Sequence, residues 1–319
     1  MNIFSCIRSS CRAISDQSRH VKIQKCKLND YVKSLPLDEV ETLEMDTENH
    51  FCGDIEQTLN YFFVLDSINF GSGYFRYLDK IPDKTGYFTV AYLLKEEFLK
   101  KGGMNCRYLQ NISTEDCYRI FRQRPENSEI FPLMNLFAKA LNQLGDFIEH
   151  DFSGSFKELL LRCENSAARL VETLIRMPFY KDISIYEGQK VYFLKRAQIT
   201  ASDLNIALKN SGPGQFDDIA ELTIFADNLV PHVLWIDGVL KYSDSLSEKI
   251  RKNQFIASGS NEEIELRANA VHAVELLKAE AAHTGKPITS QQLDYLLWNR
   301  GQAEKYHDPA PHSTFSFYY

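Results

Sequence analysis

The stretch SNEEIELRANAVHAVELLKAEAAHTGKP, residues 260–287, predicts a long helix. It opens on Ser260 and Glu263, which stand at the spacing of a capping box. Gly285 and Pro287 end it, because glycine favours the turn after a helix and proline cannot continue one. Apolar residues recur at helical intervals between these limits: Ile264, Val271, Val274 and Leu277. An apolar face of this length is typical of a helix packed in a globular core.

The same pattern extends outward along the chain. Helical spacing of apolar residues recurs in four further segments: 54–70, 87–100, 131–147 and 155–176. Thr289 with Gln292 offers a second capping box, which opens a last helix. Residues 186–189 predict a turn between two short β-like runs. No repeat or linker divides the chain, so we expect a mainly α fold, with a small β-turn excursion, as a single domain over residues 1–319.

The first fifteen residues, MNIFSCIRSSCRAIS, have two interpretations. The absence of any acid before Asp16 faintly resembles a transit peptide. The positions of Ile3, Ile7 and Ile14, on or near one face, are those of an ordinary amphipathic helix. The amphipathic helix is the favoured interpretation.

The charge balance argues against one class of partner. The chain carries 36 basic and 43 acidic residues, for a net charge of −7. Proteins that bind polyanions over a broad surface need clustered Lys and Arg. We therefore expect no nucleic-acid polymer as a partner, while a small anionic ligand in a local basic pocket stays compatible with the composition.

The cysteines favour a reducing compartment. There are seven of them, at irregular spacing and without a CxxC pair. Such a set suggests neither a disulfide framework nor a zinc site. No apolar run approaches the length of a membrane span. We expect a cytoplasmic monomer that binds no metal and no membrane.

Residues 225–228, Phe-Ala-Asp-Asn, set the carboxylate of Asp227 between two apolar runs. A charge in a core costs several kcal/mol unless it is paired, so an unpaired accident is not expected. One interpretation is that Asp227 or Asn228 caps a short helix with Pro231 in its first turn. The other is a catalytic or ligand-binding carboxylate. Position alone favours the cap.

Asp294 is a second candidate for a buried acid. It lies on the last predicted helix, with Leu297 and Trp298 as its i+3 and i+4 neighbours. Asp227 and Asp294 could divide labour, one stabilising a developing cation and the other orienting a substrate. The structural alternative is that each acid caps or pairs locally.

Three more polar side chains also have structural alternatives. Ser72 stands between glycines in FGSGYF (70–75), where backbone N–H groups could approach a phosphate or a base, but a helix C-cap explains Gly71 equally well. His50, near the start of a helix, is as a lone histidine more often structural than catalytic. Lys195 ends an apolar run, and is either a snorkelling residue or an anion contact.

Several ordered segments together resemble the queuosine salvage proteins. They are HFCGDIEQTLNYFFVLDSINFGSGYF (50–75), YEGQKVYFLKRAQITASDL (186–204), LTIFADNLVPHVLWIDGVLKYSD (222–244), EEIELRANAVHAVELL (262–277), LDYLLWNRGQ (293–302) and the ending HSTFSFYY (312–319). The resemblance extends from about CRAISDQSRHVKI (11–23) to the C-terminus.

The resemblance implies a specific activity. Members of this family are N-glycosyl hydrolases that release the base queuine from queuosine 5′-monophosphate, for salvage into tRNA modification. It also implies an all-helical fold similar to that of helix-hairpin-helix DNA glycosylases, and no metal or organic cofactor. A binding protein that carries queuine or a modified nucleotide without cleaving it is the alternative. A DNA glycosylase fits the implied fold but conflicts with the acidic charge balance.

The family motifs place the site on particular residues. The aromatic-Ala-Asp motif falls on Phe225, Ala226 and Asp227, and the late helical acid falls on Asp294. Either acid can face the anomeric carbon, so both are assigned as catalytic. The substrate contacts that we expect are His50, Phe70, Ser72, Lys195, Phe225, Asn228, Trp298 and Asn299.

Two departures bear on those contacts. Many relatives carry a Tyr-Arg pair where this chain has Asn228 and Leu229, and some carry an acid at the position of Asn299. Contacts from these three positions are therefore expected to differ from the family pattern.

Overall fold

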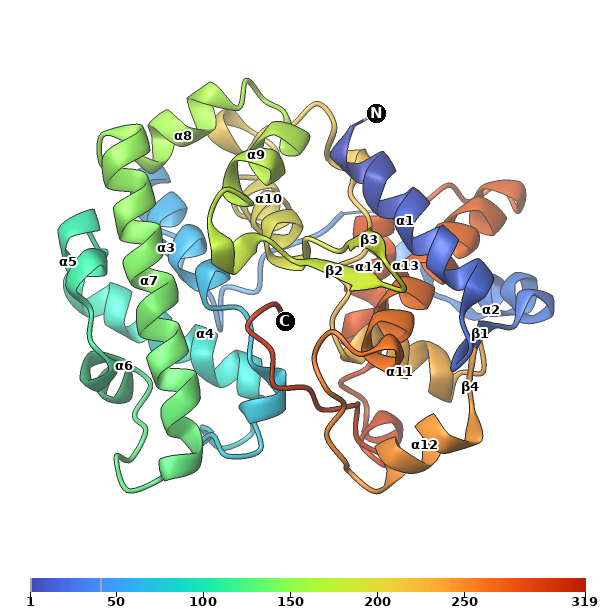
Figure 1. Ribbon diagram of the computed structural model, residues 1–319. Coiled ribbons are helices and arrows are strands. Elements are labelled where there is room, and N and C mark those ends of the chain that lie inside the picture. The colour runs from blue at the N-terminus through green and yellow to red at the C-terminus, as the bar shows by residue number, and fades with distance from the viewer. Residues whose placement is uncertain (1, 41) are drawn as a thin grey trace.

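Helices make up most of the regular structure in the computed structural model, which describes residues 2–40 and 42–319 (Figure 1). The first nine helices are α1 (Ile3–Gln17), α2 (Leu28–Ser34), α3 (Ile55–Ser67), α4 (Gly86–Lys101), α5 (Cys106–Asn111), α6 (Thr114–Ile120), α7 (Phe131–Phe152), α8 (Phe156–Arg162) and α9 (Ala167–Leu174). The remaining helices are α10 (Lys195–Ala207), α11 (Leu229–Ile236), α12 (Asp244–Arg251), α13 (Asn261–His283) and α14 (Ser290–Arg300). The predicted mainly α class is confirmed.

The strands form two short antiparallel pairs. β2 (Ile183–Tyr186) and β3 (Gln189–Tyr192) make the predicted hairpin, whose turn has positive φ at Glu187 and Gly188. β1 (Val21–Ile23) pairs with β4 (Leu240–Tyr242). This second pair was not predicted, because its strands are three residues long and more than 200 positions apart.

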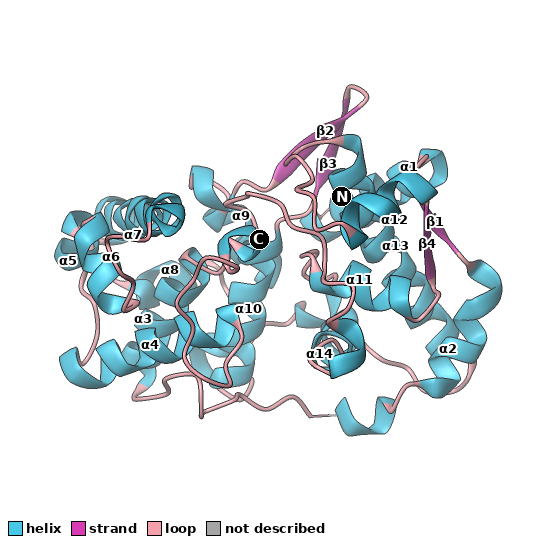
Figure 2. Ribbon diagram, turned by 90° about the horizontal axis from the view of Figure 1, so that it is seen from below, coloured by secondary structure: helices cyan, strands magenta, loops and turns pink. Residues whose placement is uncertain are grey.

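The chain forms two groups of helices with α10 between them. Helices α3 to α8 lie on one side and α1, α2 and α11 to α14 on the other, in both views (Figures 1 and 2). α10 packs against α3 and α9. The C-terminal segment runs between the two groups. One continuous set of buried apolar side chains joins these elements.

Helix α13 organises one of the two groups. The buried carboxylate of Glu265 accepts hydrogen bonds from the backbone N–H groups of His20 (2.6 Å) and Val21 (3.0 Å) and from the Tyr186 hydroxyl (2.8 Å). α1 packs along α13 and buries its apolar face, including Ile7 and Ile14. The amphipathic-helix interpretation of the N-terminus is thus confirmed.

Two local predictions need correction. Residues 155–176 are not one helix, because Glu164 and Asn165 adopt left-handed φ values of 48° and 55° and separate α8 from α9. The capping box at Ser260 forms only in part. Ser260 accepts from the N–H of Glu263, but the Glu263 carboxylate accepts from the N–H of Gly259 instead of returning to Ser260.

Other ends follow the sequence closely. The Thr289–Gln292 capping box forms at α14, and Gly102 ends α4 with φ of 76°. Across the described parts of the chain, no helix combines the length and apolar character that crossing a membrane requires.

Candidate active site

A cavity of about 400 Å³ lies where α3, α4, α10, α11 and α14 meet. Its volume suits a nucleotide-sized ligand. All the site residues expected from the sequence line it: His50, Phe70, Ser72, Lys195, Phe225, Asp227, Asn228, Asp294, Trp298 and Asn299. The fold therefore brings together residues spread over 250 positions, while their chemical roles stay predictions.

Both interpretations of Asp227 describe part of its geometry. Its Oδ1 accepts hydrogen bonds from the N–H groups of Leu229 (2.8 Å) and Val230 (3.1 Å), so it caps the start of α11. The same side chain lines the cavity. Asn228 makes no side-chain cap, and its amide donates to the carbonyl of His312 at 3.1 Å. Capping holds the Asp227 carboxylate in place at the cavity wall.

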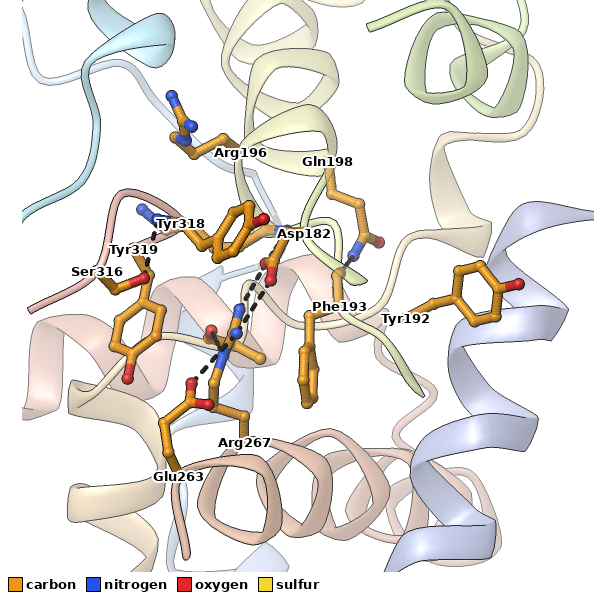
Figure 3. A network of polar contacts seen from close by, with 12 residues as sticks. Asp182, Tyr192, Phe193, Arg196, Gln198, Glu263, Arg267, Ser316, Tyr318 and Tyr319 are labelled. Atoms are coloured by element: carbon orange, nitrogen blue, oxygen red, sulfur yellow. Dashed lines mark hydrogen bonds and ion pairs between the residues drawn. The ribbon is translucent and has the colours of Figure 1, made fainter. Parts of the chain in front are cut away.

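A buried ion-pair network supports Asp227 from behind. Arg267 Nε donates to the Ala226 carbonyl at 2.8 Å, and its other nitrogens pair with Asp182 (2.5 Å) and Glu263 (3.3 Å). Figure 3 shows the guanidinium pointing to these two acids, between the rings of Phe193 and Tyr319. The sequence analysis missed this network, because Asp182 is remote in the chain from Glu263 and Arg267.

Asp294 lies close to Asp227, because it is hydrogen-bonded to the backbone of Phe225, two residues before Asp227. Asp294 Oδ1 accepts from the N–H of Phe225 at 2.8 Å, and its side chain is buried. Burial, followed by the charge of Asp227, holds the pKa of Asp294 well above its usual range. Burial also raises the pKa of Asp227, but the ammonium of Lys195 and the two N–H donors oppose that shift. The two acids therefore have different environments.

Lys195 stands beside this pair at the start of α10. Its Nζ donates to the backbone carbonyl of Asn69 (3.1 Å) and to Asn69 Oδ1 (2.9 Å). Only 5% of the residue is exposed, so the snorkelling interpretation is wrong. Burial lowers the pKa of Lys195, and the nearby charge of Asp227 opposes that shift.

His50 is held by two structural hydrogen bonds. Its Nδ1 lies 2.8 Å from the carbonyl of Asp46, which can only accept, so Nδ1 carries the proton. Burial lowers the pKa of His50, and the neutral ring then accepts from the Tyr87 hydroxyl at 2.9 Å through Nε2. Both ring nitrogens are thus occupied. Contact between His50 and a ligand passes through its ring face or through Tyr87.

Aromatic rings line the cavity on two sides. Trp298 makes edge contacts with Tyr87 and Phe88, at centroid distances of 5.8 and 5.4 Å. Phe70 packs against Phe137 at 5.3 Å. Such rings offer faces on which a planar base can stack.

Ser72 is the polar side chain of the glycine-rich turn. Its Oγ is buried and has no hydrogen-bond partner among the described residues, and Gly71 before it has φ of 95°. The hydroxyl is therefore available to a ligand in the cavity.

Asp203 on α10 is one of the titratable wall residues that the sequence analysis did not name. A signal for it existed, since Ile199, Ser202, Asp203 and Ile206 follow Lys195 at helical spacing, and all of them line the cavity. From the segment KRAQITASDL, the sequence analysis took only Lys195 as a site residue.

Comparisons with known proteins identify the family of the chain. A family model described as queuosine salvage protein matches residues 49–319. The chain belongs to this family. A queuosine 5′-phosphate N-glycosylase/hydrolase of Sphaerobacter thermophilus is 33% identical over 304 residues, which is 93% of this chain and 92% of that protein. Proteins of the same name from Dictyostelium discoideum and Mus musculus are each 31% identical, and cover 100% and 84% of this chain. The family predicted from the ordered segments is thus confirmed.

Proposed function

We propose that this chain is an N-glycosyl hydrolase that releases queuine from queuosine 5′-monophosphate. The names of its relatives support this activity over 84–100% of the chain. The observation that carries the chemistry is the arrangement of two acids on the wall of one cavity. Asp294 accepts a hydrogen bond from the N–H of Phe225, two residues before Asp227, and the ammonium of Lys195 is near both acids.

The proposed reaction develops positive charge on the ribose. As the C–N bond breaks, the sugar becomes oxocarbenium-like, and a fixed carboxylate in a dry cavity stabilises that charge with little reorganisation. Water then adds its oxygen to the anomeric carbon and one proton goes to the departing base. One acid must therefore be ionised, and another group must hold a proton.

The two environments divide these roles. Asp227 accepts two N–H bonds and faces Lys195, which favours its charged form. Asp294 is buried next to that charge, which favours its neutral form. In this proposal Asp227 is the anion beneath the sugar, and Asp294 is the neutral acid that donates a hydrogen bond to the base or its substituents.

The remaining expectations belong to the same proposal. Phe70, Phe225 and Trp298 stack on the base, Lys195 and Ser72 contact the sugar or phosphate, and His50, Asn228 and Asn299 complete the wall. The protein acts as a cytoplasmic monomer of one domain, without a cofactor and without binding a nucleic-acid polymer. Its predicted similarity to helix-hairpin-helix DNA glycosylases stays a prediction.

Substitution of each acid tests the assignment. Asp227→Asn and Asp294→Asn are expected to lower the rate of queuine release by about 10²- to 10³-fold, because each removes a group that acts in the transition state. Chromatography of the nucleotide and the free base measures the rate. The melting temperature of each variant should stay close to that of the original protein.

An exposed acid supplies the control. Asp217→Asn makes the same change at an exposed residue that does not line the cavity, and should turn over normally. Full turnover by both cavity variants contradicts the two-acid proposal. Retention of intact nucleotide by the unaltered protein, without free base, identifies a binding protein instead.

A further inference from the structure

Negative charge outnumbers positive charge around the cavity. Five carboxyl groups line it: Glu44, Asp46, Asp203, Asp227 and Asp294. Among the described residues in that lining, Lys195 is the only lysine or arginine. Ionised carboxylates without partners are costly in a closed space. The cavity is therefore built to hold protons or to receive a cationic group.

Asp203 has an unusual neighbour. Behind it, on α3, the side chain of Asp66 is fully buried, and no N–H or hydroxyl group of the described residues donates a hydrogen bond to either of its oxygens. Thr200 is close, but its hydroxyl donates to the Arg196 carbonyl at 2.9 Å. The Asn69 side chain and the carboxyl of Asp203 are also close to Asp66, but the Asn69 amide nitrogen makes no hydrogen bond within the described residues, which leaves the carboxyl of Asp203. Two carboxyl groups can bond to each other only through a proton.

The two acids differ in access. Asp66 does not reach the cavity, whereas Asp203 lines it. Burial and the neighbouring Asp203 hold the pKa of Asp66 well above its usual range. Burial raises the pKa of Asp203 to about 7, against the opposing charge of Lys195. Asp66 thus stays protonated and donates a hydrogen bond to Asp203. Asp203 is the member of the pair that can ionise towards a ligand.

We propose that Asp203 receives the protonated amine of the substrate's cyclopentenediol side chain, and that it gives up a proton when the amine binds. The inference rests on the proposed function, since the amine is a feature of queuine. The step exchanges one positive charge for another: the ammonium enters, and the proton of Asp203 leaves to solvent. Asp203 is then a specificity residue, which separates queuine from a deazaguanine base without the amine.

Among the described residues near the Asp66–Asp203 pair, the other titratable groups are neutral, cationic or already held by a hydrogen bond. The titratable groups near the Asp66–Asp203 pair are Tyr61, Tyr87, Tyr180, Lys195, Arg196 and Asp294. Burial raises the pKa of all three tyrosines, so they stay neutral near pH 7. Lys195 is already held by Asn69, and Asp294 by Phe225. Asp203 is therefore the carboxyl of this group that is left for a cation.

Calorimetry of the free bases tests the inference without requiring turnover. Queuine and 7-deazaguanine share the base edge and differ in the amine-bearing side chain. Asp203→Asn, which keeps size and shape, should weaken queuine binding by about 10- to 100-fold, the value of one charged hydrogen bond, and leave 7-deazaguanine nearly unchanged. Asp217→Asn is the matched control, because it makes the same change at an exposed residue that does not line the cavity. It should bind both bases normally.

Proton release is a second measurement, made on the unaltered protein. Titration in two buffers of different ionisation enthalpy should show release of about one proton per queuine below pH 7 and less above it, because Asp203 is then already ionised. No release is expected for Asp203→Asn.

The outcomes separate the inference from the proposed function. Equal loss of both bases in Asp203→Asn, or uptake of protons by the unaltered protein, overturns the role of Asp203. Failure of the unaltered protein to bind queuine at all contradicts the proposed function instead.

Discussion

Two groups of charged side chains, one enclosed by the protein and one at the cavity, are built differently. In the first, Asp182, Arg267 and Glu263 are each at most 2% exposed and meet in direct ion pairs. In the second, Asp66, Asp203, Asp227 and Asp294 surround one ammonium, that of Lys195. The first group satisfies its charges within the protein, and the second does not.

The difference separates a structural role for the first group from a proposed catalytic role for the second. Burial alone favours the neutral form of Arg267, but Asp182 and Glu263 outweigh it and keep its pKa above the usual value. That guanidinium stays charged and holds the backbone at Ala226. The acids of the second group have pKa values raised by burial, so a ligand can shift their protons. An excess of one charge, rather than burial as such, marks the proposed active site.

The largest expected effect comes from the first group. Arg267→Met leaves Asp182 and Glu263 buried without a cation, and should lower the free energy of unfolding by about 3–5 kcal/mol. Urea unfolding measures the change. Arg176→Met is the control, because it removes a surface pair with Asp151 that is 57% and 31% exposed at the side chains, and should cost about 0–1 kcal/mol. Equal losses in the two variants would show that the buried ion pairs of Arg267 stabilise the fold no more than a surface ion pair does.

A smaller effect is expected in the pH dependence of turnover. Activity requires ionised Asp227, so it should fall as the pH decreases through the raised pKa of that acid. Lys195→Met removes the ammonium that opposes the increase, and the acidic limb of the rate profile should move to higher pH by about one unit or more. An unmoved limb in a folded variant means that another group controls it.

The smallest effect is a gain in stability within the second group. When a carboxyl keeps its proton in the folded state, the free energy of unfolding of the protein falls as the pH rises from the ordinary pKa of that group towards the raised one. Asp66 is such a group, and Asp66→Asn cannot ionise. The substitution should therefore raise the melting temperature at pH 8 by about 2–4 °C more than it does at pH 5. The same gain at both pH values would point to packing instead.

Local signals predicted much of this molecule. The capping box at Thr289 and Gln292 and the turn after Tyr186 both form as expected. They succeed because each depends on neighbours within a few residues. The break between α8 and α9 was missed, since the apolar spacing continues across it while the backbone at Asn165 does not.

The site was predicted in part. The ordered segments led to Asp227, Asp294 and Lys195, which share the cavity. The role of Asp227 as both cap and wall residue was not foreseen, because the two interpretations were treated as alternatives. Asp203 and Asp66 were not predicted, because their significance lies in their contact with each other across two helices.

The sequence by itself determined most of the long helices, the cap at Thr289, the hairpin and the family, since propensity and spacing act over short distances along the chain. Tertiary structure decided which carboxyl groups face one another, that Asp182 joins Glu263 at Arg267, and which acids are left with a proton. Burial and pairing set those properties, and both depend on residues that are remote in the sequence and meet only in the fold.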